Sequence, residues 1–584
     1  MTSFFGELTR RNVVRVAVAY AIVGWLLVQV ADTFFPALQL PEWTVTLVAG
    51  LVILGFPLAL ILSWAYELTP EGMKRSHKVP PPESITHVTG RKLDFAIIGA
   101  LVLALGFVVY NYVLEDGEVV TGVLPNSVAV LPFENLSPDP NNAYYAAGIH
   151  EEILNQLVKL SALNVIARTS MQQYANTDKS IPEIARELNV ETVMEGSVRY
   201  DAGRIRITTQ LNDGVTGLHI WSETYTRDFD DIFAIESDIA MNVANALEAE
   251  FSLAEQESIE KIPTDSPAAY AQYLRALSTE VPSTELRIQY LDEAIALDPE
   301  FAVAYATKAL WLASAFTGFG NDPAARTEQE RSLRDSADRA LALDATLGLA
   351  HAALGGLHQA NWRGAEAEQA FERAYQLSPS DADVLMLYGR FKRYRGEYDE
   401  SIRLNRRAVE LDPNSPFHRA QLAHAYRLAK SYDAAASAYR NALELSPISG
   451  TSHINLAFVE VARGNHGEAI SELRLAEQLE PNVWRLPQIA LAYKQAERPD
   501  DAMRLFSEFG RQAIEDPVDE AAWIRAYIAV GDYDQALERL EAAVDDRAIL
   551  DVSTLTEFAA NPWNDPVLNE PEFRELLDGL WIDK

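Results

Sequence analysis

Three long runs of hydrophobic residues dominate the first part of the chain, at about 13–30, 43–66 and 95–113. About 20 helical residues, each rising 1.5 Å, cover the roughly 30 Å hydrocarbon core of a bilayer. None of the runs has an ionisable residue near its centre, which argues against a transport pathway through them. The pattern therefore predicts three transmembrane helices.

The basic residues around these runs indicate an orientation, because Lys and Arg in short loops stay in the cytoplasm. They lie before the first run and between the second and third: Arg10, Arg11, Arg15, Lys74, Arg75, Lys78, Arg91 and Lys92. We therefore expect residues 1–114 to anchor the chain in a bacterial inner membrane. The N-terminus would be cytoplasmic, and the residues after about 115 would be periplasmic.

The pattern changes after a linker at 115–125 to short β-branched runs that alternate with amphipathic stretches. Between 126 and 250 we expect strands at 127–133, 164–168, 191–200, 204–212 and 218–226, and helices at 147–160, 182–188 and 232–249. Alternating strands and helices followed by a β-meander predict a compact α/β domain. A second linker is expected at 251–267.

A self-similar pattern begins at residue 268. Four prolines that end hydrophobic helical stretches lie 34 residues apart, at positions 379, 413, 447 and 481. This period of paired helices, with small residues such as Gly389 and Ala408 at crossing points, resembles the tetratricopeptide repeat. We expect about eight repeats in 268–549, with a 12-residue insertion within 316–327, and a capping segment at 550–584.

These patterns together predict a membrane-anchored α + α/β fold class: three transmembrane helices, a small α/β domain, and an α-solenoid of about eight tetratricopeptide repeats. The motifs SVAVLPFENLSPDPNNAYYAAGIHEEILNQL, VMEGSVR and HIWSETYTRDFDDIFAIESDIA also resemble the N-terminal domain of the TolB translocation protein and related FlgO-like envelope domains. That resemblance implies an interaction module. The chain departs from the family's pattern because no β-propeller follows, and no cyclase or winged-helix domain precedes the hydrophobic runs.

Charge and composition exclude several classes of function. The formal net charge is −35, whereas residues 1–114 carry +1, so the following 470 residues carry −36. Such a part of the chain repels nucleic acid. The sequence contains no cysteine, which excludes disulfides and thiol chemistry.

No motif predicts catalysis, a cofactor or a metal. His150 and Glu151 begin what could be a zinc-protease helix, but position 154 is Leu where the second His must stand. The match therefore fails, and we interpret this stretch as a helix N-terminus, whose positive dipole end favours acidic side chains. Dinucleotide-binding and Walker motifs are absent from the sequence. We therefore expect a binding protein and not an enzyme.

One basic stretch interrupts the acidic repeats. Residues 386–430 hold ten Lys or Arg against five Asp or Glu. The repeat register selects a set of groove-lining residues: Arg390, Arg393, Tyr394, Phe417, His424 and Arg427. Because arginine binds carboxylates through two parallel hydrogen bonds, we expect an acidic or carboxylate-terminated peptide as ligand. The alternative is that these arginines pair with acidic neighbours on a solvated face.

Two functions remain open from the sequence. The first is a membrane-anchored periplasmic scaffold that binds partner proteins through the repeat groove and the α/β domain. The second is a signal-transducing receptor that acts on a separate cytoplasmic partner through the basic loop at 71–92. The pattern identifies neither the partner nor the oligomeric state.

Overall fold

The computed structural model describes residues 123–545 with short gaps, together with isolated segments on either side of that range. The gaps are 140–141, 176, 230–231, 279–282, 316–322, 481, 516–517 and 519. The isolated segments are 20, 24, 66–69, 72–75, 558 and 566–579. The chain divides into two compact units, Met1–Val119 and Val120–Lys584.

The expected membrane-anchored fold class is corrected by the structure. Among the described residues, no helix combines the length and the hydrophobicity that crossing a membrane requires. The expected spans at 13–30, 43–66 and 95–113 lie outside the described residues, apart from three positions. The first unit shows an antiparallel hairpin of β1 (Tyr66–Thr69) and β2 (Gly72–Arg75). The fold class supported for the described residues is a helical solenoid with a small mixed-sheet domain.

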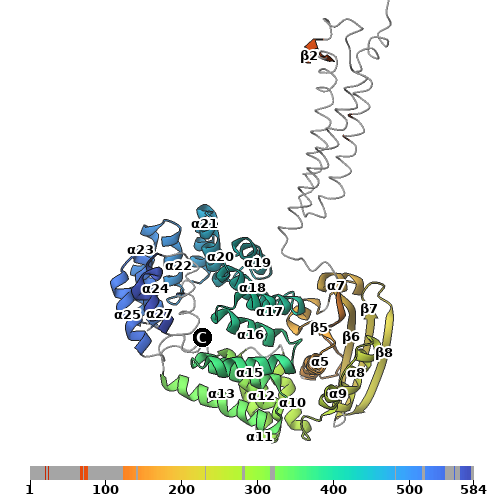
Figure 1. Cartoon of the computed structure of the whole chain (residues 1–584). Helices are drawn as coiled ribbons and strands as arrows, with labels where there is room; N and C mark the ends of the chain where they lie inside the picture. The colour runs from red at the N-terminus through yellow and green to blue at the C-terminus, as the bar shows by residue number, and fades with distance from the viewer. Residues whose placement is uncertain are drawn as a thin grey trace, which may run out of the picture. The chain divides into compact units, whose positions relative to one another are not determined.

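The second unit begins with that domain, whose sheet has the strand order β5-β3-β6-β7-β8, with β4 beside β6 (Figure 1). The strands are β3 (Leu124–Val130), β4 (Glu134–Asn135), β5 (Asn164–Val165), β6 (Val190–Asp201), β7 (Arg204–Asp213) and β8 (His219–Asp228). Strand β3 runs parallel to β5 and β6, and β6, β7 and β8 form an antiparallel meander. The strands predicted from the alternation of hydrophobic residues are confirmed, although β5 is shorter than expected.

The helices of this domain also lie close to their predicted positions. They are α5 (Ala143–Val158), α6 (Arg168–Met171), η4 (Gln172–Tyr174), α7 (Ile181–Leu188), α8 (Ile232–Ala246) and α9 (Leu253–Glu260). A capping box of Ser180 and Glu183 starts α7, and Asn189 ends it in the left-handed conformation. The 251–267 segment, expected as a linker, contains α9.

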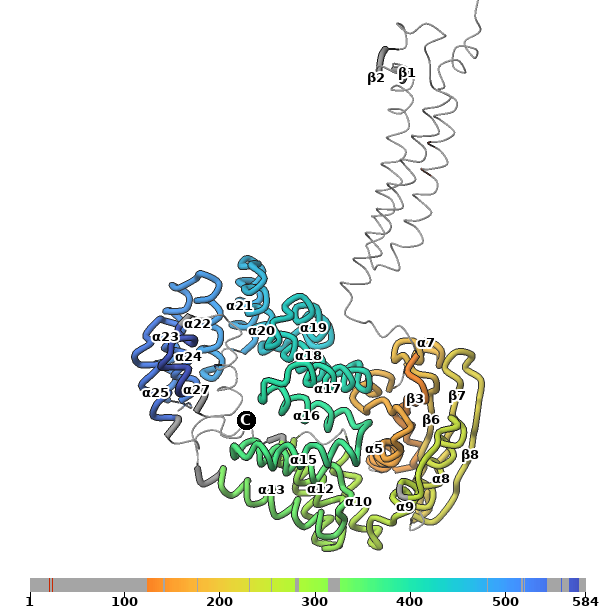
Figure 2. The backbone as a smooth tube through the Cα atoms, viewed as in Figure 1, coloured from red at the N-terminus to blue at the C-terminus, as the bar shows by residue number. Residues whose placement is uncertain are grey.

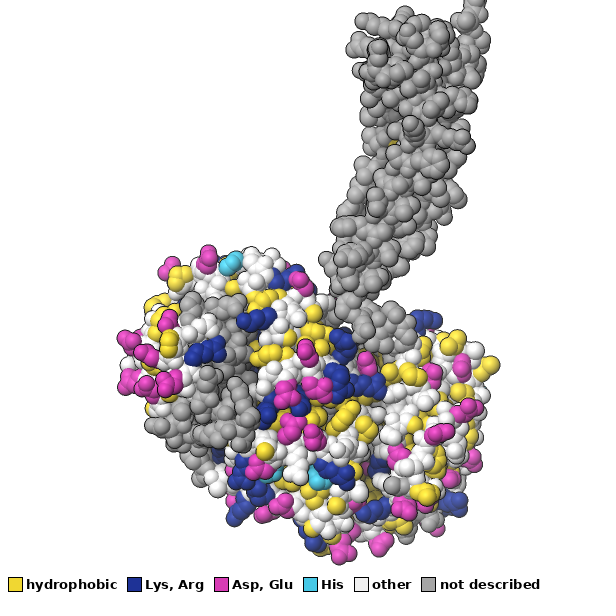
Figure 3. All heavy atoms as spheres, in the orientation of Figure 1, with side chains coloured by type: hydrophobic (Ala, Val, Ile, Leu, Met, Phe, Trp, Pro, Cys, Tyr) yellow, Lys and Arg dark blue, Asp and Glu magenta, His cyan; other side chains and the backbone are white. Residues whose placement is uncertain are grey.

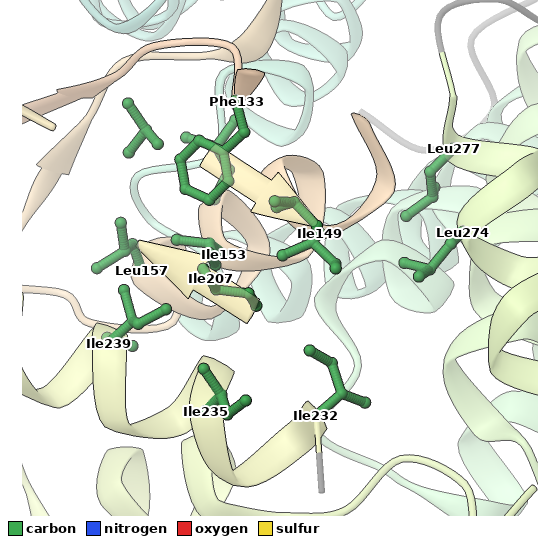
Figure 4. Packing of buried hydrophobic residues seen from close by; sticks show 14 of the residues in the cluster. Phe133, Ile149, Ile153, Leu157, Ile207, Ile232, Ile235, Ile239, Leu274 and Leu277 are labelled. Carbon is green, nitrogen blue, oxygen red and sulfur yellow. The ribbon is translucent and has the colours of Figure 1, made fainter. Parts of the chain in front are cut away.

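Strand β3 is buried on both faces of the sheet. Neighbouring side chains of a strand point to opposite faces, so alternate residues of β3 enter different cores. Val128 and Val130 belong to a core shared with α5 and α8, and Figure 4 shows Ile149, Ile153 and Ile239 in it. Ala129 belongs to a second core, which is described below. The sheet therefore forms a middle layer with helices packed on both of its faces.

In the described part of the chain sixteen helices follow, from α10 to α25, and consecutive helices pack in eight antiparallel pairs. They are α10 (Pro267–Leu277), α11 (Thr284–Leu297), α12 (Ala302–Ala315), α13 (Pro323–Leu343), α14 (Gly348–Ala360), α15 (Gly364–Leu377), α16 (Ala382–Tyr394), α17 (Tyr398–Leu411), α18 (Pro416–Leu428), α19 (Tyr432–Leu445), α20 (Gly450–Ala462), α21 (His466–Leu479), α22 (Leu486–Gln495), α23 (Pro499–Glu515), α24 (Glu520–Val530) and α25 (Tyr533–Asp545). The helix pairs expected from the 34-residue period are thus present.

The insertion expected at 316–327 lies partly outside the described residues. Its described part extends α13, which has 21 residues where α15 has 14. At the other end of the array, η8 (Pro566–Asn569) and α27 (Pro571–Gly579) follow α25. Leu568 and Phe573 are buried in the core of the last repeats, so this part of the capping segment covers hydrophobic residues.

We call the first helix of each pair, from α10 to α24, an A helix and the second a B helix. Successive A helices contact one another, as α14, α16 and α18 do, whereas each B helix packs mainly on its own A helix and the next one. Closer packing along the A helices bends the array, and Figure 2 shows the resulting curve. The A helices therefore line the inner face of the solenoid.

Candidate peptide-binding surface

The fourth and fifth A helices, α16 and α18, carry all six residues selected from the sequence. Helix α16 begins at Asp381, whose carboxylate accepts hydrogen bonds from the N–H groups of Asp383 and Val384 at 2.9 and 3.0 Å. Its partner α17 approaches closely at Gly389, where a Cβ atom would lie 2.5 Å from the Asn405 amide nitrogen. The small residue expected at this crossing point is thus required by the packing.

Helix α18 begins at Ser415, whose hydroxyl accepts from the N–H of His418 at 3.2 Å. The His418 ring lies between two carboxylates, with Nδ1 3.0 Å from Asp412 and Nε2 3.3 Å from Asp383. Burial alone would lower the pKa of His418, but the hydrogen bonds with Asp383 and Asp412 outweigh it and raise this pKa to about 9. A charged His418 thus ties the start of α18 to the start of α16.

The α/β domain holds the turns that precede these two helices. The N–H of Ala167 donates to the Leu411 carbonyl oxygen at 2.7 Å. The hydroxyl of Ser170 donates to Asp412 at 2.6 Å, and the hydroxyl of Ser380 donates to the Leu163 carbonyl oxygen at 3.0 Å. These contacts continue into the second core of the domain, in which sheet residues share hydrophobic contacts with α15, α16 and α17. The sheet domain and the middle repeats are therefore one packed body.

Arg393 is buried, with 2% of its surface exposed, although the sequence placed it in an open groove. Its Nη1 donates to the side-chain oxygen of Gln421 on α18 at 2.9 Å, and its guanidinium lies 5.2 Å from the centre of the Tyr394 ring. Burial lowers its pKa, and the nearby charge of Arg390 lowers it further. Within the described residues Arg393 has no carboxylate partner, and its Nε atom makes no hydrogen bond.

Arg427 occupies the equivalent position 34 residues later and is also buried, with 1% exposed. Its Nη2 lies 2.8 Å from Nε2 of His424. Arginine can only donate, so this nitrogen of His424 is the acceptor and carries no proton. The guanidinium of Arg427 lies 5.9 Å from the centre of the Phe458 ring on α20. The two arginines thus have aromatic neighbours on the same row of A helices.

The other selected residues differ in exposure. Tyr394 is buried, Arg390 and His424 are half-buried, and Phe417 is 51% exposed. The structure therefore places the six residues on two neighbouring A helices, but only Phe417 is an open surface residue. Peptide binding by these six residues stays a prediction.

Most other basic residues of 386–430 have ordinary partners. The side-chain nitrogen of Lys392 lies 2.6 Å from a carboxylate oxygen of Glu368. The corresponding distances are 2.6 Å between Arg403 and Glu400 and 2.7 Å between Arg407 and Glu410. Figure 3 shows Lys and Arg side chains among Asp and Glu near the middle of the visible face. These three residues, which are not among the six selected, thus pair with acidic neighbours, whereas Arg393 has no carboxylate partner among the described residues.

Two residues of the candidate surface could not be identified from the sequence. Gln421 orients the Arg393 guanidinium, and Phe458 faces Arg427 from the next repeat. Both stand on A helices, but the repeat pattern tolerates many residue types at these positions. Only the contacts across neighbouring helices identify them.

A second polar cluster lies where α5 and α8 meet α10. Glu236 is completely buried, and Tyr270 donates to one of its oxygens at 2.6 Å. Glu152 accepts from Gln156 at 3.0 Å in the same interior. Burial, followed by the charge of Glu152, raises the pKa of Glu236 well above its ordinary value. No group of three or more His, Asp or Glu in the described part is arranged to hold a metal ion.

A family model of the tetratricopeptide repeat matches residues 419–449, which cover most of α18 and all of α19. The chain is 40% identical over 186 residues to a Rhizobium meliloti (strain 1021) protein named "Putative adenylate cyclase 3". The match covers 31% of this chain and 32% of the relative. The chain thus spans about a third of the length of that curated relative.

Several solved structures are similar to parts of this chain at low sequence identity. The human IFIT1 dimer with PPP-AAAA is 17% identical, covers 60% of this chain and 79% of its own, and has a TM-score of 0.38. PilF of Pseudomonas aeruginosa is 16% identical over 40% and 98%, with a TM-score of 0.31. YrrB, described as a TPR protein with an unusual peptide-binding site, is 21% identical over 33% and 93%, with a TM-score of 0.26.

Proposed function

We propose that this chain, whose tetratricopeptide solenoid is the architecture of a protein-interaction scaffold, binds an acidic or carboxylate-terminated segment of a partner protein at Arg393. One observation carries the proposal. The Arg393 guanidinium is buried, yet it faces no carboxylate among the described residues. An unpaired buried charge is costly, so a fold that keeps one gains when a carboxylate of a ligand arrives.

The surroundings of Arg393 suit such a ligand. Arg390 and Arg427 add positive charge on the same two helices, and Gln421 holds the guanidinium in one orientation through its 2.9 Å hydrogen bond. Because Arg393 is 2% exposed, a ligand carboxylate reaches it when neighbouring side chains of α16 and α18 move aside, and the planar guanidinium can then form two parallel hydrogen bonds with it. The exposed ring of Phe417 offers a hydrophobic contact at the start of α18.

The role of the α/β domain follows from its contacts with the repeats. It fixes the turn before α18 through Ala167 and Ser170 and the turn before α16 through the Leu163 carbonyl oxygen, so it sets the separation of the two binding helices. The likeness of this domain to TolB-type interaction modules supports a part in protein binding. We assign binding and not catalysis to the chain, so incubation with ATP should yield no cyclic AMP.

Location outside the cytoplasm is a separate proposal for the residues after about 115. It is supported by the distribution of Lys and Arg before that residue. Alkaline phosphatase fused after residue 120 should be active, and a fusion near residue 80 should be inactive. The opposite pattern of activity would reject this location.

The binding proposal is tested with Arg393→Met in the full chain. Methionine fills most of the same space without a charge, whereas Glu would leave a buried unpaired carboxylate. The probe is a fluorescent decapeptide of alternating Glu and Leu with a free C-terminus, measured by anisotropy. We expect the variant to bind it at least tenfold more weakly, a loss of about 1.4 kcal/mol or more. Its thermal stability should stay the same or rise, because a buried unpaired charge is removed.

Two controls separate specific binding from general effects. Arg403→Met removes a surface arginine that pairs with Glu400, and it should change neither binding nor stability. A second peptide with Gln in place of Glu and an amidated end should bind the wild type at least tenfold more weakly. If the folded Arg393→Met variant keeps full affinity, or if the wild type does not prefer the acidic peptide, the proposal is wrong.

A further inference from the structure

Strand β8 forms an open edge of the mixed sheet. It pairs with β7 along its whole length, and no described strand lies on its other side. Eight of its ten residues are exposed, with Ile220 44% exposed, and the preceding turn exposes Val215 and Leu218 further. Proteins normally shield such an edge because its unpaired backbone groups can accept another strand.

The charges on β8 have an unusual arrangement. Glu223 and Arg227 lie on the same face of the strand because they are four residues apart. At about 3.3 Å per residue they are roughly 13 Å apart, which is too far for an ion pair within one copy. Among the described residues neither side chain forms a hydrogen bond or an ion pair with another group. The strand thus carries one positive and one negative group with no partner at ion-pair distance.

We propose that two copies of this chain associate through their β8 strands, antiparallel and in the register that places Tyr225 opposite Tyr225 of the second copy. In an antiparallel pair related by a two-fold axis, residue numbers that face each other have a constant sum. With Tyr225 on the axis, Glu223 faces Arg227 of the other copy, and this ion pair occurs twice. Registers centred on position 223 or 224 lose these pairs, and the former brings two Glu223 side chains together.

This association satisfies the free hydrogen-bonding groups of the edge and joins two sheets into one. Opposite charges that face each other across strands stabilise the pairing, and like charges destabilise it. Thr224 then faces Thr226, both of which are exposed on the outer face in a single copy. A second copy fits this edge because the strand is complementary to itself in charge.

Sedimentation velocity of the full chain at micromolar concentrations tests the proposal. We expect a dimer for the wild type. Glu223→Arg alone and Arg227→Glu alone place like charges in both contacts, so each should raise the dimer Kd at least tenfold. The double variant Glu223→Arg/Arg227→Glu recreates the pairs with reversed signs and should restore the dimer. Arg206→Glu, at an exposed position on β7, is the matched control and should leave Kd unchanged.

A second measurement tests the register without altering charge. The chain contains no cysteine, so Thr224→Cys/Thr226→Cys introduces the only thiols. Facing residues of paired strands have Cα atoms about 4.5 to 5.5 Å apart, a separation that a disulfide can bridge. Oxidation should therefore give a covalent dimer. A wild type that sediments as a monomer, a dimer that both single reversals leave intact, or a folded cysteine variant that forms no covalent dimer overturns the proposal.

Discussion

Ser170 donates a 2.6 Å hydrogen bond to Asp412, although 242 residues separate them in the chain. The same hydroxyl oxygen accepts from the N–H of Asn414 at 2.8 Å, so one side chain serves two groups of the turn before α18. Both Ser170 and Asp412 are buried. This contact joins the α/β domain to the middle of the solenoid.

Ser170→Ala should therefore destabilise the domain and the middle repeats together. The change leaves one oxygen of Asp412 and the N–H of Asn414 without partners, at a cost of about 1 to 3 kcal/mol. Urea unfolding followed by circular dichroism measures it. Ser507→Ala is the control, because that hydroxyl is exposed and bonds only within its own helix, to Met503. Equal stability of both variants would show that the contact contributes nothing.

The stability of the protein should depend on His418 in the alkaline range. Its pKa is about 9 in the folded state and about 6.5 in an unfolded chain. A raised pKa contributes stability that is fully present below pH 6.5 and is lost as pH rises through 9. We expect the wild type to lose on the order of 3 kcal/mol relative to His418→Gln across this range. Unfolding at pH 6 and pH 10 tests this, and parallel pH profiles of the two proteins would contradict it.

The buried carboxyl of Glu236 should affect the stability of the protein over a different range of pH. Because its pKa is raised, its contribution to stability is present below about pH 4.5 and declines as pH rises toward the folded-state pKa. Glu236→Gln imitates the neutral acid and keeps an acceptor for Tyr270. The variant should match the wild type at pH 4.5 and be more stable at pH 8. Glu257→Gln, at an exposed position of α9, should show no such difference, and a destabilised Glu236→Gln at pH 8 would reject the prediction.

Gly148 marks a close approach between the α/β domain and the first repeat. A Cβ atom at this position of α5 would lie 2.6 Å from Cβ and 3.0 Å from Cα of Leu274 on α10. The backbone cannot yield easily, so Gly148→Ala should cost about 1 to 3 kcal/mol. Gly510→Ala, in the middle of α23 with open space around it, should instead stabilise by up to about 1 kcal/mol. Thermal unfolding compares them, and a neutral Gly148→Ala would mean that α5 and α10 can separate.

The sequence predicts the repeats well because their signal is local. A proline such as Pro413 follows four of the helix pairs at a fixed spacing of 34 residues, and the helices in the structure follow that period. The strands of the α/β domain are equally local, since hydrophobic alternation identifies β6, β7 and β8 within one or two residues.

The burial of the residues at the candidate surface could not be predicted in the same way. The repeat register places Arg393 on an A helix, but its burial depends on how closely α18 approaches and on Tyr394 beside it. The contact of Ala167 with Leu411 could not be predicted from the sequence either, because it joins backbone atoms far apart in the chain. Long-range packing of this kind leaves no periodic pattern in a single sequence.

The contact between the α/β domain and the turns before α16 and α18 has a mechanical consequence. A repeat array whose units touch only their neighbours behaves as a spring, because each interface yields a little under tension. Here the bonds at Ser170 and Ala167 close a loop that includes the first four helix pairs, α10 to α17. Tension applied to the two ends of the second unit would therefore stretch the repeats from α18 onward, while the closed part resists until those bonds break. The chain would combine a stiff segment with a compliant one in a single solenoid.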